Sequence, residues 1–168
     1  MNDAVATVVV CDAGPLIHLD QLGCLDLLGD FPRVVVPDAV WKEVAHHRPT
    51  ALNQGGVPLD RVSPSGAASP ELAALHRLLI LHAGEAQALQ IAQELDAELL
   101  LTDDTAARLA AQNLHLAVHG TLGILLRAVR RKQRTREQVL DVLHVLPLRS
   151  TLHVKRALLE QIIRQVDS

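Results

Sequence analysis

Aromatic side chains are almost absent from this sequence. Phe31 and Trp41 are the aromatic residues among its 168 positions, and tyrosine does not occur. Apolar residues nevertheless make up 49% of the chain, so the hydrophobic core is expected to be aliphatic. Because base stacking needs aromatic faces, any contact with nucleic acid would depend on backbone charge and shape.

The sequence also has few cysteines, a small net charge and only short apolar runs. Cys11 and Cys24 form no spaced framework, which suits a reducing cytoplasm. A formal net charge of -3 gives no global attraction to polyanions. The apolar runs are too short to cross a membrane, and residues 1–7 lack the basic stretch of a signal peptide. At this length we expect one domain over residues 1–168, with a core at about 7–130 and a helical extension at about 135–168.

The most informative stretch runs from an apolar segment into a single acid. Residues 8–11 are apolar without polar alternation, which predicts a strand buried on both faces, as in a parallel sheet. Gly14 and Pro15 then force a turn, and proline is well tolerated at the start of a helix. Asp12 is therefore predicted at the carboxyl end of a central strand, where open α/β sheets bind their ligands.

The rest of the chain alternates between strands and helices. The strands are expected at 34–36, 57–62, 99–101 and 116–118. Helices are expected from Pro37 to His47, from Ser69, from Gly84 and from Asp103-Asp104, with a surface connection over 48–69. Periodic leucine, isoleucine and valine residues predict three further helices after residue 120, the second opened by a capping box of Thr135 and Gln138. This alternation predicts an α/β fold with a parallel sheet covered on both faces.

Acidic residues recur at equivalent places in this pattern. The set comprises Asp12, Glu43, Glu85 and the pair Asp103-Asp104. If the sheet is parallel, these carboxylates meet at one edge, where they need a cation or raised pKa values to coexist. Hard oxygen ligands select Mg²⁺ or Mn²⁺, which activate water and stabilise charge on phosphodiester oxygens.

Each acid also has a purely structural interpretation. Asp103 or Asp104 is equally well explained as the cap of the following helix. Glu85 in a first helical turn is favoured by the helix dipole, and Glu43 is equally typical of a solvated helix face. Asp12 is harder to explain in this way, because it directly follows an apolar strand.

Taken together, these segments resemble PIN-domain proteins, and more narrowly the prokaryotic branch related to VapC-type toxin ribonucleases. The matching segments are 11–17, 36–44, 84–86, 101–104 with Ala107-Arg108, and 120–125. The resemblance implies a three-layer α/β/α sandwich with extra C-terminal helices and Mg²⁺- or Mn²⁺-dependent cleavage of RNA. By it, Asp12, Glu43, Glu85 and Asp104 would be the catalytic, metal-binding acids, with Asp103 as a neighbour or alternate ligand.

The resemblance also leaves two functions open. The first is a metal-dependent endoribonuclease, with the toxin of a toxin–antitoxin pair as its narrower form. The second is a catalytically silent PIN module that binds RNA or a protein partner. A homodimer and an antitoxin partner are expected by resemblance alone.

A dense basic run is a candidate RNA-binding edge. It comprises Arg127, Arg130, Arg131, Lys132, Arg134 and Arg136, and the first four are the residues we assign to RNA. A solvated helix end, where cations suit the dipole, explains the run equally well. The histidines show no zinc spacing, and we expect them at the surface or in packing, with His82 and His119 outside the site.

Overall fold

A parallel sheet forms the centre of the protein. The computed structural model describes residues 8–53 and 56–168, so the expectation for residues 1–7 lies outside the described part. The strands are β1 (Val8–Cys11), β2 (Arg33–Pro37), β3 (Leu59–Val62), β4 (Leu99–Leu101) and β5 (Val118–His119). They are arranged in the order β3-β2-β1-β4-β5, and each neighbouring pair is parallel.

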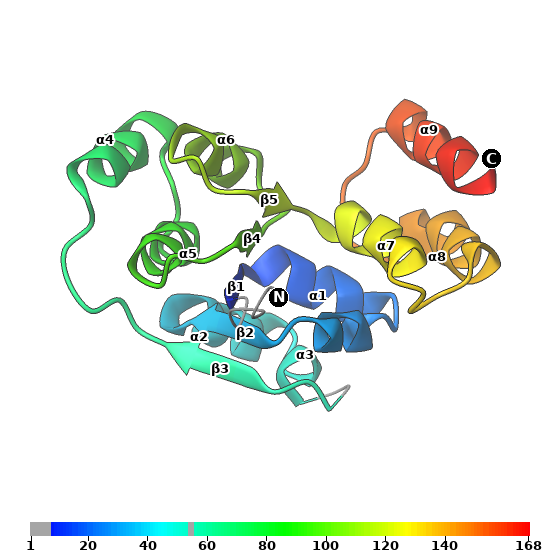
Figure 1. The fold of residues 1–168 in the computed structure, drawn as a ribbon, viewed down its shortest axis with the longest axis horizontal. Coiled ribbons are helices and arrows are strands. Elements are labelled where there is room, and N and C mark those ends of the chain that lie inside the picture. Colours follow the sequence, from blue (N-terminus) through cyan, green and yellow to red (C-terminus); the bar gives the residue numbers. More distant parts are fainter. Residues whose placement is uncertain (1–7, 54–55) are drawn as a thin grey trace, which may run out of the picture.

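Helices cover both faces of this sheet (Figure 1). The first half of the chain contributes α1 (Ala13–Gln21), the 3₁₀ helix η1 (Leu25–Asp30), α2 (Asp38–His47), α3 (Thr50–Asn53) and α4 (Pro70–Leu79). The second half contributes α5 (Ala83–Glu94), α6 (Thr105–Asn113), α7 (Thr121–Arg130), α8 (Arg136–Arg149) and α9 (Arg156–Asp167). The predicted three-layer α/β/α sandwich is confirmed.

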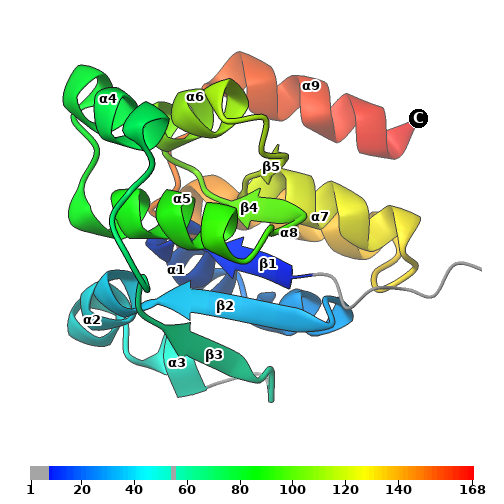
Figure 2. The same ribbon diagram turned by 60° about the vertical axis from the view of Figure 1, so that its left-hand side comes forward.

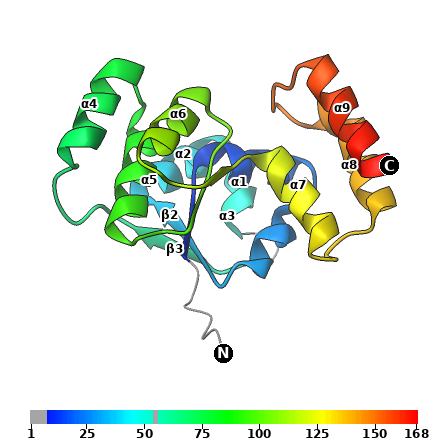
Figure 3. The same ribbon diagram turned by 45° about the horizontal axis from the view of Figure 1, so that its top comes forward.

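Alternate residues of each strand pack into two different hydrophobic clusters. In β1, Val9 and Cys11 face the cluster built with α1, α2, α7, α8 and α9, whereas Val10 faces the cluster built with α4, α5 and α6. All three residues are fully buried, as expected for a strand covered on both faces. Figure 3 shows the two groups of helices on opposite sides of the strands.

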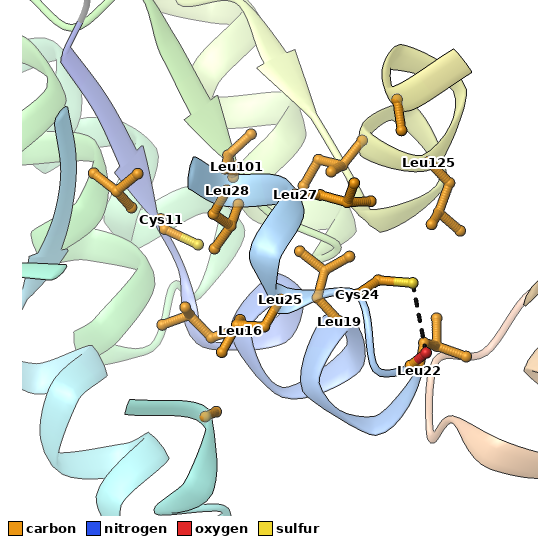
Figure 4. Packing of buried hydrophobic residues seen from close by; sticks show 14 of the residues in the cluster. Cys11, Leu16, Leu19, Leu22, Cys24, Leu25, Leu27, Leu28, Leu101 and Leu125 are labelled. Carbon is orange, nitrogen blue, oxygen red and sulfur yellow. Dashed lines mark hydrogen bonds between the residues drawn. The ribbon is translucent and has the colours of Figure 1, made fainter. Parts of the chain in front are cut away.

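The core is aliphatic, as the composition predicts. Figure 4 shows leucines of α1 and η1 interlocking beneath the end of β1, with Leu125 of α7 against them. Cys24 lies in the same cluster, where its Sγ is 3.5 Å from the Leu22 carbonyl oxygen. Both cysteines are free thiols.

Local sequence signals fix several of the helix boundaries. The side chain of Ser69 caps α4 by accepting from the Leu72 N–H, and Thr135 with Gln138 forms the predicted capping box of α8. The helix predicted from Pro37 to His47 is confirmed as α2.

The surface connection predicted over residues 48–69 contains its predicted strand as β3 (Leu59–Val62), and residues 54–55 lie outside the described chain. It also contains the single turn α3, which was not predicted and whose start is held by Asp20 of α1. The Asp20 carboxylate accepts from Arg48 Nε at 2.6 Å and from Thr50 Oγ1 at 2.7 Å. Arg48 and Thr50 lie 28 and 30 residues from Asp20 in the sequence, beyond the range of local patterns.

The edge strand β5 begins later than predicted. His115 adopts a left-handed backbone conformation with φ 58°, and the Leu116 N–H then donates to the Ala111 carbonyl at 2.8 Å. Leu116 therefore belongs to the end of α6, and the strand starts only at Val118.

No helix within the described residues is both long enough and apolar enough to cross a membrane.

Candidate active site

The strand order places a switch point between β1 and β4. From β1 the chain runs outward through β2 to β3, and it then returns to the other side of β1 with β4 and β5. In open α/β sheets, ligands bind outside the carboxyl ends of the strands at such a point. Asp12 follows β1, and Asp103 and Asp104 follow β4, so the switch point carries acids on both sides.

Asp12 is held rigidly at the end of β1. Its backbone N–H donates to the Leu101 carbonyl of β4 at 2.8 Å, and its side chain is only 6% exposed. Asp12 Oδ1 accepts from the Ala13 N–H at 2.9 Å, which makes Asp12 the N-cap of α1. The neighbouring thiol of Cys11 is fully buried, and burial raises its pKa well above the ordinary value, so it is not a nucleophile here.

Thr102 connects the ends of β1 and β4. Its hydroxyl donates to Asp12 Oδ2 at 2.8 Å and accepts from the Asp104 N–H at 3.2 Å. Thr102 is completely buried, so water cannot replace either bond. The threonine therefore fixes the orientation of the Asp12 carboxylate relative to the start of α6.

Glu43 and Glu85 approach Asp12 from two helices that pack against each other. Figure 2 shows α2 beside α5, at the ends toward which the β1 and β2 arrows point. A Cβ added at Gly84 would lie 3.4 Å from Glu43 Oε2 and 3.9 Å from Asp12 Oδ1. Gly84 therefore leaves a small space that both carboxylates border. Glu85 Oε2 accepts from the His82 N–H at 2.8 Å, which anchors that carboxylate at the start of α5.

The electrostatics of Asp12 reflect both its burial and its acidic neighbours. Burial raises the pKa of Asp12 from 3.8 to about 6, and the negative charges of Glu85 and Glu43 act in the same direction. The hydrogen bonds from Ala13 and Thr102 oppose this rise. Within the described residues, Asp12, Glu43 and Glu85 form no ion pair with lysine or arginine.

These side chains fit a hard divalent cation. They offer carboxylate oxygens, Asp12 and Glu43 border the space at Gly84, and in the described part of the chain none of the three is paired with a lysine or arginine. In the conformation observed, no three acidic, histidine or cysteine side chains of the described residues are grouped closely enough to hold a metal ion. Glu43 is exposed and has room to move, and a bound cation would offset the repulsion that keeps carboxylates of like charge apart.

Asp103 belongs to a different network. Its Oδ2 lies 2.7 Å from His18 Nδ1 and accepts from Thr121 Oγ1 at 2.6 Å, while its Oδ1 accepts from the Thr121 N–H at 2.7 Å. Burial raises the pKa of Asp103, but the hydrogen bonds from His18 and Thr121 outweigh it and hold this pKa below the ordinary value. Asp103 thus ties α1, β4 and α7 together.

Asp104 caps α6. Its Oδ1 accepts from the Ala107 N–H at 2.8 Å, which is the structural role that the sequence left open. Its other carboxylate oxygen, Oδ2, has no hydrogen bond to the described residues. Asp104 therefore serves as a cap through one oxygen and keeps the other without a hydrogen bond to the described residues.

Gly120 gives the first testable prediction, because a side chain there would break into the Asp103 network. A Cβ at Gly120 would lie 2.6 Å from Asp103 Oδ1 and 3.3 Å from the Thr102 carbonyl oxygen. Gly120→Ala is expected to lower the free energy of unfolding by about 1–3 kcal/mol through overpacking. Gly66→Ala is the matched control, since nothing lies within 4 Å of its added Cβ. Urea unfolding compares the two, and equal midpoints would contradict the expectation.

The basic run divides into paired and unpaired residues. Arg127 and Arg131 both bind Asp30, at 2.6 Å and 2.9 Å, and Arg134 binds Asp26 at 2.8 Å. Arg130 has no carboxylate partner within the described residues. Arg136 donates to the Ser168 carbonyl, and Lys132 lies with it beside a separate pocket at the start of α8. The six residues therefore do not form one continuous cationic surface.

Several residues of the site have no signal in the sequence that predicts their roles. His82 is exposed, as predicted, and its Nδ1 lies 3.4 Å from Glu85 Oε1, whereas the hydrogen bond between His18 and Asp103 was not predicted. The position of Thr102, directly before two aspartates at a strand end, is the one local clue to its role.

The comparison with known families agrees with this geometry. Residues 8–168 match the family DUF3368, which is described as a PIN domain. PIN domains have a nuclease-type fold and generally use divalent metal ions. No curated protein is similar enough in sequence to be matched.

Proposed function

The chain belongs to the PIN-domain family, and from this premise we propose that it is an endoribonuclease that hydrolyses RNA phosphodiester bonds with Mg²⁺ or Mn²⁺. One observation supports the proposal: Asp12 and Glu43 border a common space at Gly84 near the switch point of the sheet, and Glu85 lies near enough for its charge to raise the pKa of Asp12. When bound there, a divalent ion supplies Lewis-acid chemistry for the hydrolysis. Asp12, Glu43, Glu85 and Asp104 are the residues that we assign to hold it.

The protein's own residues have separable tasks in this proposal. Asp12 is the fixed ligand, because hydrogen bonds from Ala13 and Thr102 set its orientation. With a pKa of about 6, its carboxylate is charged above that pH. Glu43 is exposed and adjustable, whereas Glu85 is held by the His82 backbone. Asp103 remains the neighbour or alternate ligand of this assignment, and His18 and Thr121 hydrogen-bond to both of its oxygens.

A narrower form of the proposal is the toxin of a toxin–antitoxin pair, acting in the cytoplasm as a homodimer with an antitoxin protein as partner. Its support is the resemblance of the motifs at 11–17, 36–44 and 101–104 to VapC-type ribonucleases. The contrasting function is a silent PIN module that binds RNA or protein without a metal.

Titration with Mn²⁺ distinguishes the hydrolase from the silent module. Calorimetry is expected to show Mn²⁺ binding to the unmodified chain, weakened by about tenfold or more in Glu43→Gln, since even outer partners of a metal contribute that much. Glu71→Gln is the matched control, because Glu71 is exposed in the first turn of α4, away from the switch point. Absence of Mn²⁺ binding, or equal binding by both variants, would contradict the assignment of the site.

A further inference from the structure

His119, the last residue of β5, lies between two pockets of basic character. The smaller, of about 230 Å³, is lined by Arg108 of α6, by Gly120 and Gly123 of α7 and by residues of α9. The larger, of about 460 Å³, is lined by Arg127 and Arg130, and Arg131 also borders it. Because His119 lines both, the two pockets form a continuous surface along the β5 edge.

Positive charge on this surface exceeds the negative charge that faces it. Asp30 neutralises part of the charge of Arg127 and Arg131, and Arg127 is further fixed by stacking over the Phe31 ring at 4.1 Å. Arg108 and Arg130 have no carboxylate partner within the described residues, and both are exposed.

The acidic groups of the two pockets do not cancel this excess. Asp103 lines the smaller pocket, and Asp30 and Glu98 line the larger one. These three carboxylates face four arginines, so one positive charge remains in excess. Arg108 and Arg130 form no ion pair within the described residues, which favours the binding of an anion there.

The environment of His119 supports this assignment. Burial lowers the pKa of His119, and the positive charges of Arg130, Arg108 and Arg127 lower it further. Its ring rests against the first turn of α7, where a Cβ at Gly123 would lie only 3.1 Å from Nδ1. The neutral ring therefore serves as a fixed hydrogen-bonding group among the cations.

This surface adjoins the acidic site. Asp103 lines the smaller pocket, and its Cβ lies 3.4 Å from the position that a Cβ at Gly14 would take. Gly14 is two residues after Asp12. The smaller pocket, which Arg108 and His119 also line, therefore reaches the residues next to Asp12.

We propose that Arg108 and Arg130, which line different pockets on either side of His119, bind phosphodiester groups of the RNA strand away from the bond that is cleaved. That the ligand is RNA rests on the proposed function. A strand explains a surface that spans two joined pockets and continues to the acids better than a free phosphate does. Arginine suits this role because its planar guanidinium matches phosphate oxygens.

The test is RNA binding measured separately from cleavage. A short labelled single-stranded RNA is titrated with the full chain in the presence of a chelator, and fluorescence anisotropy gives the Kd over a range of salt concentrations. Arg108→Ala and Arg130→Ala are each expected to weaken binding about tenfold. Each should also reduce the slope of log K against log salt by about 0.7, the value for one contact on a single strand.

Arg77→Ala is the matched control, because Arg77 is an exposed arginine on α4. If the two test variants bind RNA no more weakly than this control, the subsite is wrong. Inorganic phosphate and a mononucleotide are titrated in parallel. Loss of their binding with unchanged RNA binding would also overturn the proposal, since the pocket would then serve a free phosphate. A chain that shows the expected binding losses but never cleaves RNA keeps the subsite and loses only the hydrolase.

Discussion

Replacing Asp12 by asparagine is expected to reduce RNA cleavage by more than about 100-fold, because partners one shell further from a metal already contribute about 10–100-fold. The substitution preserves the size of the side chain, and its amide oxygen still accepts from the Ala13 N–H. It removes the negative charge that the proposed cation requires. Rates measured on a labelled RNA with Mn²⁺ provide the comparison, and a chelator should stop the unmodified enzyme to a similar extent.

The same variant is expected to remain folded. Asp12 is a buried carboxylate whose charged form is disfavoured, so a neutral amide in its place does not lose stability from charge. Asp141→Asn is the control, because Asp141 is an exposed residue of α8 and lies outside the acidic group. Undiminished cleavage by a folded Asp12→Asn preparation would rule out the proposed mechanism.

The second large effect is expected on stability as a function of pH. Folding raises the pKa of Asp12 from 3.8 to about 6, so the folded state holds this proton more tightly than the unfolded state. The stability due to Asp12 is therefore complete below pH 3.8 and is lost as the pH rises through about 6. The loss amounts to about 3 kcal/mol above that pH, at 1.36 kcal/mol for each pH unit of difference.

Urea unfolding between pH 4 and pH 8 gives the free energy of unfolding of the unmodified chain and of Asp12→Asn. The change with pH in the difference between these two free energies measures the loss. The comparison with Asp12→Asn is needed because His119 changes stability in the opposite direction. The lowered pKa of His119 makes stability fall as the pH drops below about 6.5, and this effect is common to both proteins. Asp103, whose pKa is also lowered, loses its contribution only below its ordinary value of 3.8. A cation that binds the acidic group should restore stability at pH 8 but much less at pH 5, where Asp12 is protonated. If the difference in the free energy of unfolding between the two proteins does not change with pH, the raised pKa of Asp12 is contradicted.

The elements that short-range signals define were predictable. Residues 8–11 are an unbroken apolar run, and they form a strand buried on both faces. Ser69 and Thr135 mark helix starts because a side-chain oxygen that accepts from a backbone N–H three residues later acts within one turn. Such signals were enough to predict the sheet and most helices, and the resemblance to PIN-domain proteins implied the three-layer sandwich.

Features that depend on distant partners were not predictable. The turn α3 exists because Asp20 binds Arg48 and Thr50, and β5 starts late because α6 ends with His115 in a left-handed conformation. The spacing of residues along the chain says nothing of these contacts. The network of His18, Asp103 and Thr121 joins three elements for the same reason.

The order of residues alone determined where the acids would stand. An acid that directly follows an apolar strand of a parallel sheet must emerge at the carboxyl edge, as Asp12 does. Only the tertiary structure decided which charges are neutralised within the protein: Asp103 is bound by His18 and Thr121, and Arg127 and Arg131 are bound by Asp30. Ion pairs and hydrogen bonds depend on distances between atoms in space, and residues far apart in the chain become neighbours only when the core packs.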